Sequence, residues 1–286
     1  MGKIGIIGGS GLYDIEGLEN RQWLDVKTPY GAPSDKFLLA KLGEREVVFL
    51  PRHARGHKIN PSQINYRANI WGMKSLDVTH IISVTACGSL KEEIRPLDFI
   101  IPLQFVDRTN KARINTFFDE GIVVHVSFAQ PVCSELACIM HTAVKNMGIR
   151  VHYGGTYINM EGPQFSTLAE SNLYRGWSMD IIGMTNATEA KLAREAEICY
   201  ATLASATDYD CWRETGESVT VEMILDNLTK NVANSKWIIS KVIPHIPQEQ
   251  KCSCKDALQY AIVTSADSIP KEVKEKLKII IGKYIK

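Results

Sequence analysis

Short apolar runs suited to β-strands alternate along most of the chain with longer amphipathic segments suited to helices. The runs with strand character are residues 3–8, 37–41, 46–50, 79–84, 98–101, 156–159, 180–184 and 201–207. The segments with helical character are residues 61–76, 133–147, 166–177, 187–198 and 220–242. Alternation of this kind is typical of an α/β fold, so we expect a central β-sheet with helices on both of its faces.

The length of the chain, 286 residues, is near the upper end of what one hydrophobic core supports. Residues 244–250 (PHIPQEQ) are the one stretch that resembles a linker, and residues 271–286 contain six lysines and two glutamates around an apolar stripe. We therefore expect one domain over residues 1–245, and a C-terminal helical extension over 246–286 that packs on this body or on a neighbouring subunit.

Charge and cysteine usage exclude several classes of protein. A net charge of +1 lacks the basic excess of a nucleic-acid-binding chain, and no apolar run approaches the roughly 18 residues that cross a bilayer. Neither nucleic acid nor a membrane is an expected partner. The seven cysteines are odd in number and scattered, which favours a reducing cytoplasm. The sequence leaves open whether Cys133 pairs with Cys199, and Cys252 with Cys254.

A glycine-rich turn, GGSG, follows the first expected strand. Its backbone amides and the Ser10 hydroxyl suit an anion such as phosphate, although a plain tight turn accounts for the pattern equally well. The match to a dinucleotide-binding fingerprint is incomplete, because Asp14 occupies the position of the third glycine. We therefore do not expect a nicotinamide cofactor.

A basic loop follows the strand at residues 46–50. It contains Arg52, His53, Arg55, His57 and Lys58. Arginine offers a planar fork to phosphate oxygens, and ligands of open α/β sheets bind at such strand ends. A solvated surface loop is the alternative. The two histidines lack a third ligand at a suitable spacing, so we expect no metal there.

Two further strand-end motifs carry groups suited to a sugar and an aromatic base. In MEGPQFSTLAES, Glu161 can accept two hydrogen bonds from a sugar diol and Phe165 can stack on a ring. A helix cap at Ser166 beside a core phenylalanine is the alternative. In ATDYDCW, Asp208 and Asp210 point to the same side of the chain, and their repulsion should raise one pKa toward a range useful for donating a proton.

Six motifs in collinear order, between about residue 3 and about residue 245, carry a family resemblance: GGSGLYD, PRHARGHKINPSQINYRANIW, TACGSL, MEGPQFST, IIGMTN and ATDYDCW. Together they resemble the 5′-methylthioadenosine phosphorylases, which belong to the trimeric purine nucleoside phosphorylases. The resemblance implies a mixed central sheet in a single domain. It also implies a pentosyltransferase that converts 5′-methylthioadenosine and phosphate to adenine and 5-methylthioribose 1-phosphate, in purine and methionine salvage.

The resemblance further implies a homotrimer or a dimer of trimers, and inorganic phosphate as co-substrate with no metal or organic cofactor. It assigns roles residue by residue. The residues matched to the phosphate site are Ser10, Arg52, His53, Thr85, Ala86 and Thr185. Met184 would lie under the ribose with Glu161 near it, and Phe165 and Ile182 would contact the base, with Asp208 and Asp210 facing its N7 and 6-amino edge. The residues matched to the 5′-methylthio pocket are Val221, Ile224, Leu225, His57 and, from a neighbouring copy, His125.

Other activities remain to be separated from this one. Thr188, Ser205 and Ala206 depart from the family pattern next to the base, so selectivity between 6-amino and 6-oxopurines stays open. A phosphorylase of inosine or methylthioinosine is the nearest alternative, although an ionised carboxylate repels a 6-oxo oxygen. A hydrolytic nucleosidase would not need the basic loop. A non-catalytic nucleoside-binding protein would keep the pocket but not the turnover.

Overall fold

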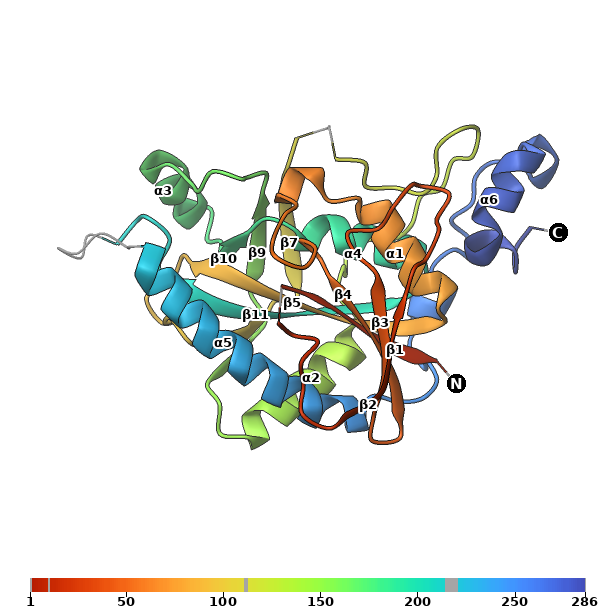
Figure 1. Cartoon of the computed structure of the whole chain (residues 1–286). Coiled ribbons are helices and arrows are strands. Elements are labelled where there is room, and N and C mark those ends of the chain that lie inside the picture. The colour runs from red at the N-terminus through yellow and green to blue at the C-terminus, as the bar shows by residue number, and fades with distance from the viewer. Residues whose placement is uncertain (1, 10, 111–112, 214–220, 286) are drawn as a thin grey trace.

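The computed structural model describes residues 2–9, 11–110, 113–213 and 221–285, and for residues 221–225 the backbone alone. One mixed, 11-stranded sheet runs through it (Figure 1). Its strands are β1 Lys3–Gly8, β2 Leu18–Leu24, β3 Phe37–Leu42, β4 Arg45–Pro51, β5 Val78–Ser89, β6 Phe99–Ile101, β7 Gln104–Arg108, β8 Val151–Tyr153, β9 Thr156–Met160, β10 Ile181–Gly183 and β11 Cys199–Asp208. The order along the main path is β2-β3-β4-β1-β5-β10-β9-β7, and β11 pairs with β5 and β6.

Helices cover both faces of this sheet, as predicted (Figure 1). On one face α2 (Ser134–Asn146) packs against α5 (Val221–Val242), and on the other α1 (Tyr66–Ser75) packs against α4 (Asn186–Glu195). The short α3 (Leu168–Gly176) lies at the end of the molecule near β9 and β10. The α/β class and the single mixed sheet are therefore confirmed.

The central strands are apolar without interruption because both of their faces are buried. Along β1, Ile4 and Ile6 point into the cluster shared with α2 and α5, whereas Ile7 belongs to the cluster shared with α1 and α4. The alternation follows the two-residue period of a strand. At about 25 cal/mol per Å² of apolar surface, burial of such side chains is the main stabilising contribution to this core.

The C-terminal extension packs on the body of its own chain. Its helix α6 (Lys271–Ile281) buries Val273, Leu277 and Ile280 in the cluster under α1 and α4. The buried Glu197 of the body accepts hydrogen bonds from Tyr284 Oη at 2.6 Å and from the Leu258 amide at 3.0 Å. The apolar stripe among the lysines is thus a packing face.

The helix predicted over residues 61–76 is broken. A 3₁₀ turn, Pro61–Gln63, begins after Asn60, whose side chain accepts from the amides of Ser62 and Gln63. Asn65 then caps α1 by accepting from the Ala68 amide at 3.1 Å, so the helix starts afresh at Tyr66. The physical reason is that an asparagine side chain competes for helix amides and favours a cap over an interior position.

Other differences concern strands. β5 extends to Ser89, five residues past its predicted end at 84, and β2, β7 and β8 were not predicted. β2 is mostly exposed and polar, and β8 has three residues, so neither carries a period-two apolar signal.

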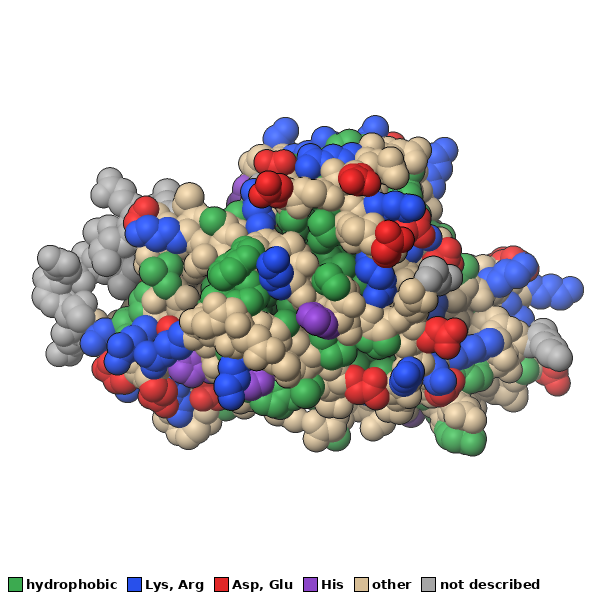
Figure 2. All heavy atoms as spheres, turned by 90° about the horizontal axis from the view of Figure 1, so that it is seen from below, with side chains coloured by type: hydrophobic (Ala, Val, Ile, Leu, Met, Phe, Trp, Pro, Cys, Tyr) green, Lys and Arg blue, Asp and Glu red, His purple; other side chains and the backbone are tan. Residues whose placement is uncertain are grey.

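Acidic and basic side chains are interspersed on the face drawn in Figure 2. The described residues of this face form no large patch of a single charge. Across the described segments, no helix is both long and apolar enough to span a bilayer.

Candidate active site

Four parallel strands bring the predicted site residues to one edge of the sheet. β1 is parallel to β4 and to β5, and β5 is parallel to β11, so their carboxyl ends lie at the same edge. Arg52 follows β4, Thr85 and Ala86 lie toward the end of β5, and Asp208 ends β11 opposite Gly88. Ligands of α/β sheets bind at this edge. Ser10, which follows β1, lies outside the described residues.

Arg52, a residue of the predicted phosphate site, is buried and forms hydrogen bonds to three other residues. Its guanidinium forms a two-point ion pair with Glu189 of α4, in which Nη2 lies 3.1 Å from Oε2. Nη2 also donates to Ser83 Oγ at 2.6 Å, and Nη1 donates to the Val84 carbonyl at 3.1 Å. These bonds to described residues occupy four of the five N–H groups. One N–H on Nη1 is left for an anion.

A hydrogen-bond network extends from this ion pair under the start of α4. Glu189 accepts from Ser83 Oγ at 2.7 Å and from Tyr200 Oη at 2.9 Å. Asn186 donates to Ser83 and to Tyr200, each at 3.0 Å. Thr185, the N-cap residue of α4, is buried beside Asn186. The amide end of a helix attracts anions, so Thr185 stands where a phosphate would be stabilised.

His53 and His57 lie together next to Arg52. Their rings stack with centroids 4.4 Å apart, His57 being the exposed one. Burial, together with the charge of Arg52, lowers the pKa of His53 to about 4. His53 Nδ1 lies 2.8 Å from the Ile59 carbonyl, which can only accept, so Nδ1 carries the proton. The ring is neutral at pH 7, and its Nε2 is an acceptor suited to the P–OH of a hydrogen phosphate ion.

The two aspartates meet at Gly88, where β5, β10 and β11 come together. A Cβ built on Gly88 would lie 3.0 Å from Ile182, 3.2 Å from Asp208 and 3.3 Å from Asp210. Gly88 of β5 is the pairing partner of Ile182 on β10 and of Asp208 on β11. The glycine therefore leaves room where three residues predicted to contact the base converge. They are Ile182, Asp208 and Asp210.

The aspartates are joined to each other and to the chain around them. The Asp210 amide donates to Asp208 Oδ1 at 2.7 Å, and Thr207 Oγ1 donates to Asp208 Oδ2 at 2.6 Å. Burial raises the pKa of Asp208 and of Asp210, and the negative charge of Asp210 raises that of Asp208 further. The predicted upward shift is thus supported by geometry, with burial as its larger cause.

The loop after β9 approaches the aspartates from the other side. Cys211 Sγ lies 3.4 Å from the Ser166 carbonyl, which links this loop to the segment after β11. Phe165 is 71% exposed, so the alternative of a core phenylalanine is wrong. Ser166 does not cap α3, because Thr167 does so in a capping box with Glu170.

Glu161 and Met184 are brought together by Arg113. Arg113 Nε lies 2.8 Å from Glu161 Oε1, and its Nη1 donates to the Met184 carbonyl. The Asn110 amide and the Ser62 hydroxyl also donate to the Glu161 carboxylate. Hydrogen bonds and the Arg113 charge outweigh burial, so the pKa of Glu161 is lowered and the carboxylate is ionised. An ionised acid fixed in this way can accept from sugar hydroxyls.

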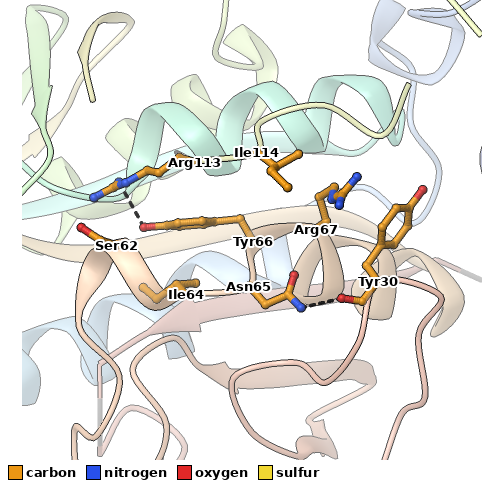
Figure 3. Close-up of a pocket in the computed structure, with 8 residues that line it drawn as sticks. All are labelled: Tyr30, Ser62, Ile64, Asn65, Tyr66, Arg67, Arg113 and Ile114. Carbon is orange, nitrogen blue, oxygen red and sulfur yellow. Dashed lines mark hydrogen bonds between the residues drawn. The ribbon is translucent and has the colours of Figure 1, made fainter. Parts of the chain in front are cut away.

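A pocket of about 270 Å³ lies beside this ion pair (Figure 3). The residues that line it are Tyr30, Ser62, Ile64, Asn65, Tyr66, Arg67, Arg113 and Ile114. Figure 3 shows the Arg113 guanidinium next to the Tyr66 hydroxyl, with which it forms a 3.3 Å hydrogen bond. The pocket therefore adjoins the predicted sugar site through Arg113 and Ser62.

The predicted 5′ pocket is only partly covered by the structure. The side chains of Val221, Ile224 and Leu225 lie outside the described residues. The His125 side chain is exposed. Its backbone amide donates to the Ala261 carbonyl of the C-terminal extension at 2.9 Å. His57 lies with the phosphate residues, next to His53.

Three residues that organise the site were not predicted: Ser83, Arg113 and Glu189. Ser83 is a polar residue inside an apolar strand, and that signal in the sequence was available. Glu189 looks like an ordinary acidic residue in the first turn of a helix, and Arg113 like one more basic residue in a polar loop. Their ion-pair partners, Arg52 for Glu189 and Glu161 for Arg113, become evident only in the three-dimensional structure.

Comparison with known proteins agrees with this geometry. A sequence profile of the Phosphorylase superfamily matches residues 3–244. The S-methyl-5′-thioadenosine phosphorylase of Geobacter sulfurreducens is 55% identical over 282 residues, which cover 99% of each chain. The chain belongs to the phosphorylase superfamily, in the family of the 5′-methylthioadenosine phosphorylases.

Solved structures of this phosphorylase family share the fold. A methylthioadenosine phosphorylase from an Antarctic soil metagenomic library is similar with a TM-score of 0.93 at 46% identity, covering 98% of each chain. The methylthioadenosine phosphorylase of Schistosoma mansoni in complex with adenine is similar with a TM-score of 0.82 at 36% identity, covering 91% of this chain and 96% of the other. The extension after residue 244 lies beyond the superfamily profile but within the Antarctic match.

Proposed function

We propose that this phosphorylase cleaves 5′-methylthioadenosine with inorganic phosphate, to give adenine and 5-methylthioribose 1-phosphate. The observation that carries the proposal is the arrangement of one sheet edge. Arg52 and His53 lie after β4, while Asp208 and Asp210 meet Gly88 at the ends of β11 and β5. An anion region and a pair of half-buried carboxyl groups are thus held by the same parallel strands.

The chemistry of the reaction fits the two halves of this edge. Breaking an N-glycosidic bond builds positive charge on the sugar and negative charge on the departing purine. A phosphate held near Arg52, His53, Thr85, Ala86 and Thr185 stabilises the first charge and supplies the nucleophile. Its oxygen bonds to the anomeric carbon as the bond to the base nitrogen breaks.

Asp208 acts on the second charge. Its raised pKa favours a carboxylic acid, which donates a proton to N7 of the leaving adenine. Asp210 accepts from the 6-amino group, while Ile182 and Phe165 contact the ring. Glu161, ionised and fixed by Arg113, accepts from the ribose hydroxyls above Met184. In this proposal the reaction needs phosphate as co-substrate and no metal or organic cofactor.

Comparison of three nucleosides under saturating phosphate tests the substrate assignment. We expect kcat/KM for 5′-methylthioadenosine to exceed that for inosine by at least about 10²-fold, because a carboxylate that accepts from a 6-amino group repels a 6-oxo oxygen. Adenosine should fall between them, since it keeps the amino group but places a hydroxyl in the apolar 5′ pocket. Faster cleavage of inosine would contradict the roles of Asp208 and Asp210.

We also propose that the active form is a trimer or a dimer of trimers in the cytoplasm, with His125 of a neighbouring copy completing the 5′ pocket. The exposure of His125 leaves it available to a neighbour. Light scattering coupled to gel filtration, with activity measured across the peak, tests this assembly. We expect activity only at a trimeric or hexameric mass, and an active monomer would contradict the shared site.

A further inference from the structure

Four of the seven cysteines meet at one place far from the active site. Cys133 directly precedes α2, Cys199 begins β11, and Cys252 and Cys254 belong to the C-terminal extension. All four Sγ atoms lie within 4.8 Å of one another. β11 has ten residues, so its first residue and the aspartate at its other end are about 30 Å apart at 3.3 Å per residue. The cluster is therefore no part of the catalytic pocket.

The spacing of the sulfur atoms suits four ligands around one ion. Cys252 Sγ lies 3.7 Å from Cys133 Sγ and 3.2 Å from Cys199 Sγ. A tetrahedron with metal–sulfur bonds of about 2.3 Å has sulfur–sulfur edges of about 3.8 Å. All seven cysteines are free thiols in the structure. Disulfides would pair the four sulfurs two by two and would not require Cys252 to approach both Cys133 and Cys199.

The surroundings of the cluster also suit bound thiolates. Cys133, Cys199 and Cys254 are buried, in an apolar cluster that includes Ile243 and Ile246, which restricts access of water. The Gln250 side-chain amide donates to Cys199 Sγ at 3.3 Å and to the Glu197 carbonyl at 3.0 Å. Outer hydrogen bonds of this kind orient metal ligands.

We propose that Cys133, Cys199, Cys252 and Cys254 bind one zinc ion as a closed structural site. Four sulfur ligands in tetrahedral positions are the donor set that zinc prefers, and closure by four protein ligands leaves no position for a substrate. Binding releases the thiol protons to solvent and changes no oxidation state.

The ion would fasten the C-terminal extension to the body. It joins residues 133 and 199 of the body to residues 252 and 254 of the extension. A few residues later in the chain, residues 261–263 support the segment that carries His125. That support consists of backbone hydrogen bonds from the His125 amide to the Ala261 carbonyl, and from the Val263 amide to the Val123 carbonyl, each at 2.9 Å. Loss of zinc should therefore loosen the extension without touching the catalytic residues.

Metal analysis of the full chain, purified from zinc-containing medium and dialysed, tests the proposal. We expect about one zinc per chain, and at least a tenfold loss of zinc in Cys252→Ser. The matched control is Cys138→Ser, an exposed cysteine on α2, which should keep the zinc content of the wild type. Equal zinc in Cys252→Ser and Cys138→Ser would overturn the ligand assignment.

Measurements on the wild-type chain remain decisive even where Cys252→Ser does not fold. Cobalt added to the metal-free protein should give the intense d–d absorption of a tetrahedral tetrathiolate, and zinc should displace it. Chelation of the zinc should lower the midpoint of thermal unfolding and expose four further reactive thiols. Three results for the purified wild-type chain would each overturn the zinc site. The first is a chain without metal and with seven free thiols. The second is a chain lighter by four hydrogens with only three free thiols, which means two disulfides, and the third is iron in place of zinc.

Discussion

Replacement of Asp208 by asparagine is expected to lower kcat/KM for 5′-methylthioadenosine about 10²–10⁴-fold, the usual contribution of a general acid. Asparagine keeps the shape of the side chain: its Oδ1 can accept from the Asp210 amide, and its Nδ2 can donate to the Thr207 hydroxyl oxygen in place of the bond that Asp208 accepts from it. It has no acidic proton to donate to N7. Steady-state rates of adenine release, with unfolding midpoints measured alongside, separate lost chemistry from lost stability.

The pH profile gives this prediction a second readout. Burial raises the pKa of Asp208, so the protonated, active form persists to higher pH than an exposed aspartate would allow. The wild-type kcat/KM should therefore fall as pH rises through this raised pKa. In Asp208→Asn that limb should disappear.

A matched substitution at the opposite edge of the sheet is the control. Asp77 directly precedes β5, is mostly exposed and forms an ion pair with Lys3 at 3.6 Å. Asp77→Asn should leave kcat/KM within about twofold, because exposed ion pairs contribute only about 0–1 kcal/mol to stability and none of its atoms reaches the site. Equal activity of Asp208→Asn and Asp77→Asn would rule out Asp208 as the proton donor.

Replacement of Glu189 by glutamine is expected to lower the free energy of unfolding by about 3–5 kcal/mol, the typical cost of leaving a buried charge without its partner. Arg52 and Glu189 are both almost fully buried, and the carboxylate also accepts from Ser83 and Tyr200. In the wild type this carboxylate raises the pKa of Arg52 against the lowering effect of burial. Without the carboxylate the guanidinium still stays charged, because arginine is not deprotonated in proteins, and it is then buried without its partner. Urea denaturation at fixed protein concentration measures the loss.

The control lies on the same helix. Glu195 is also buried, but the groups that bond its carboxylate are the Thr116 hydroxyl and the Phe117 amide, and neither is a cation. Burial raises the pKa of Glu195 to about 7, so the ionised carboxylate destabilises the fold as pH rises from the unfolded value through 7. Glu195→Gln should therefore be as stable as the wild type, or more stable, at pH 8. Losses of similar size in both glutamine variants would show that the ion pair is not the cause.

The sequence predicted the strands and helices best where burial imposes a clear pattern. β1 and β11 read as apolar runs because both of their faces are covered, and the motifs after them lie at the shared carboxyl edge because parallel strands end together. The prediction was least accurate where local chemistry competes with periodicity. Asn65 interrupts an otherwise helical pattern by capping a new helix.

The parts of the site that the sequence could not predict are partnerships across long separations. Arg52 and Glu189 are 137 residues apart, and Arg113 and Glu161 are 48 apart. No local spacing connects them, because the contacts depend on how α4 and the loop near Arg113 pack over the sheet edge. The four cysteines are a similar case, since scattered positions conceal a common location.

The central claim is that phosphate, and not water, attacks the sugar. Phosphorus NMR of the reaction with 5′-methylthioadenosine, run with and without inorganic phosphate, tests it most directly. We expect adenine release only when phosphate is present, together with a new sugar-phosphate resonance equal in amount to the adenine. Adenine released at the same rate without phosphate, with no sugar phosphate formed, would make the enzyme a hydrolase and contradict the role given to Arg52, His53 and Thr185.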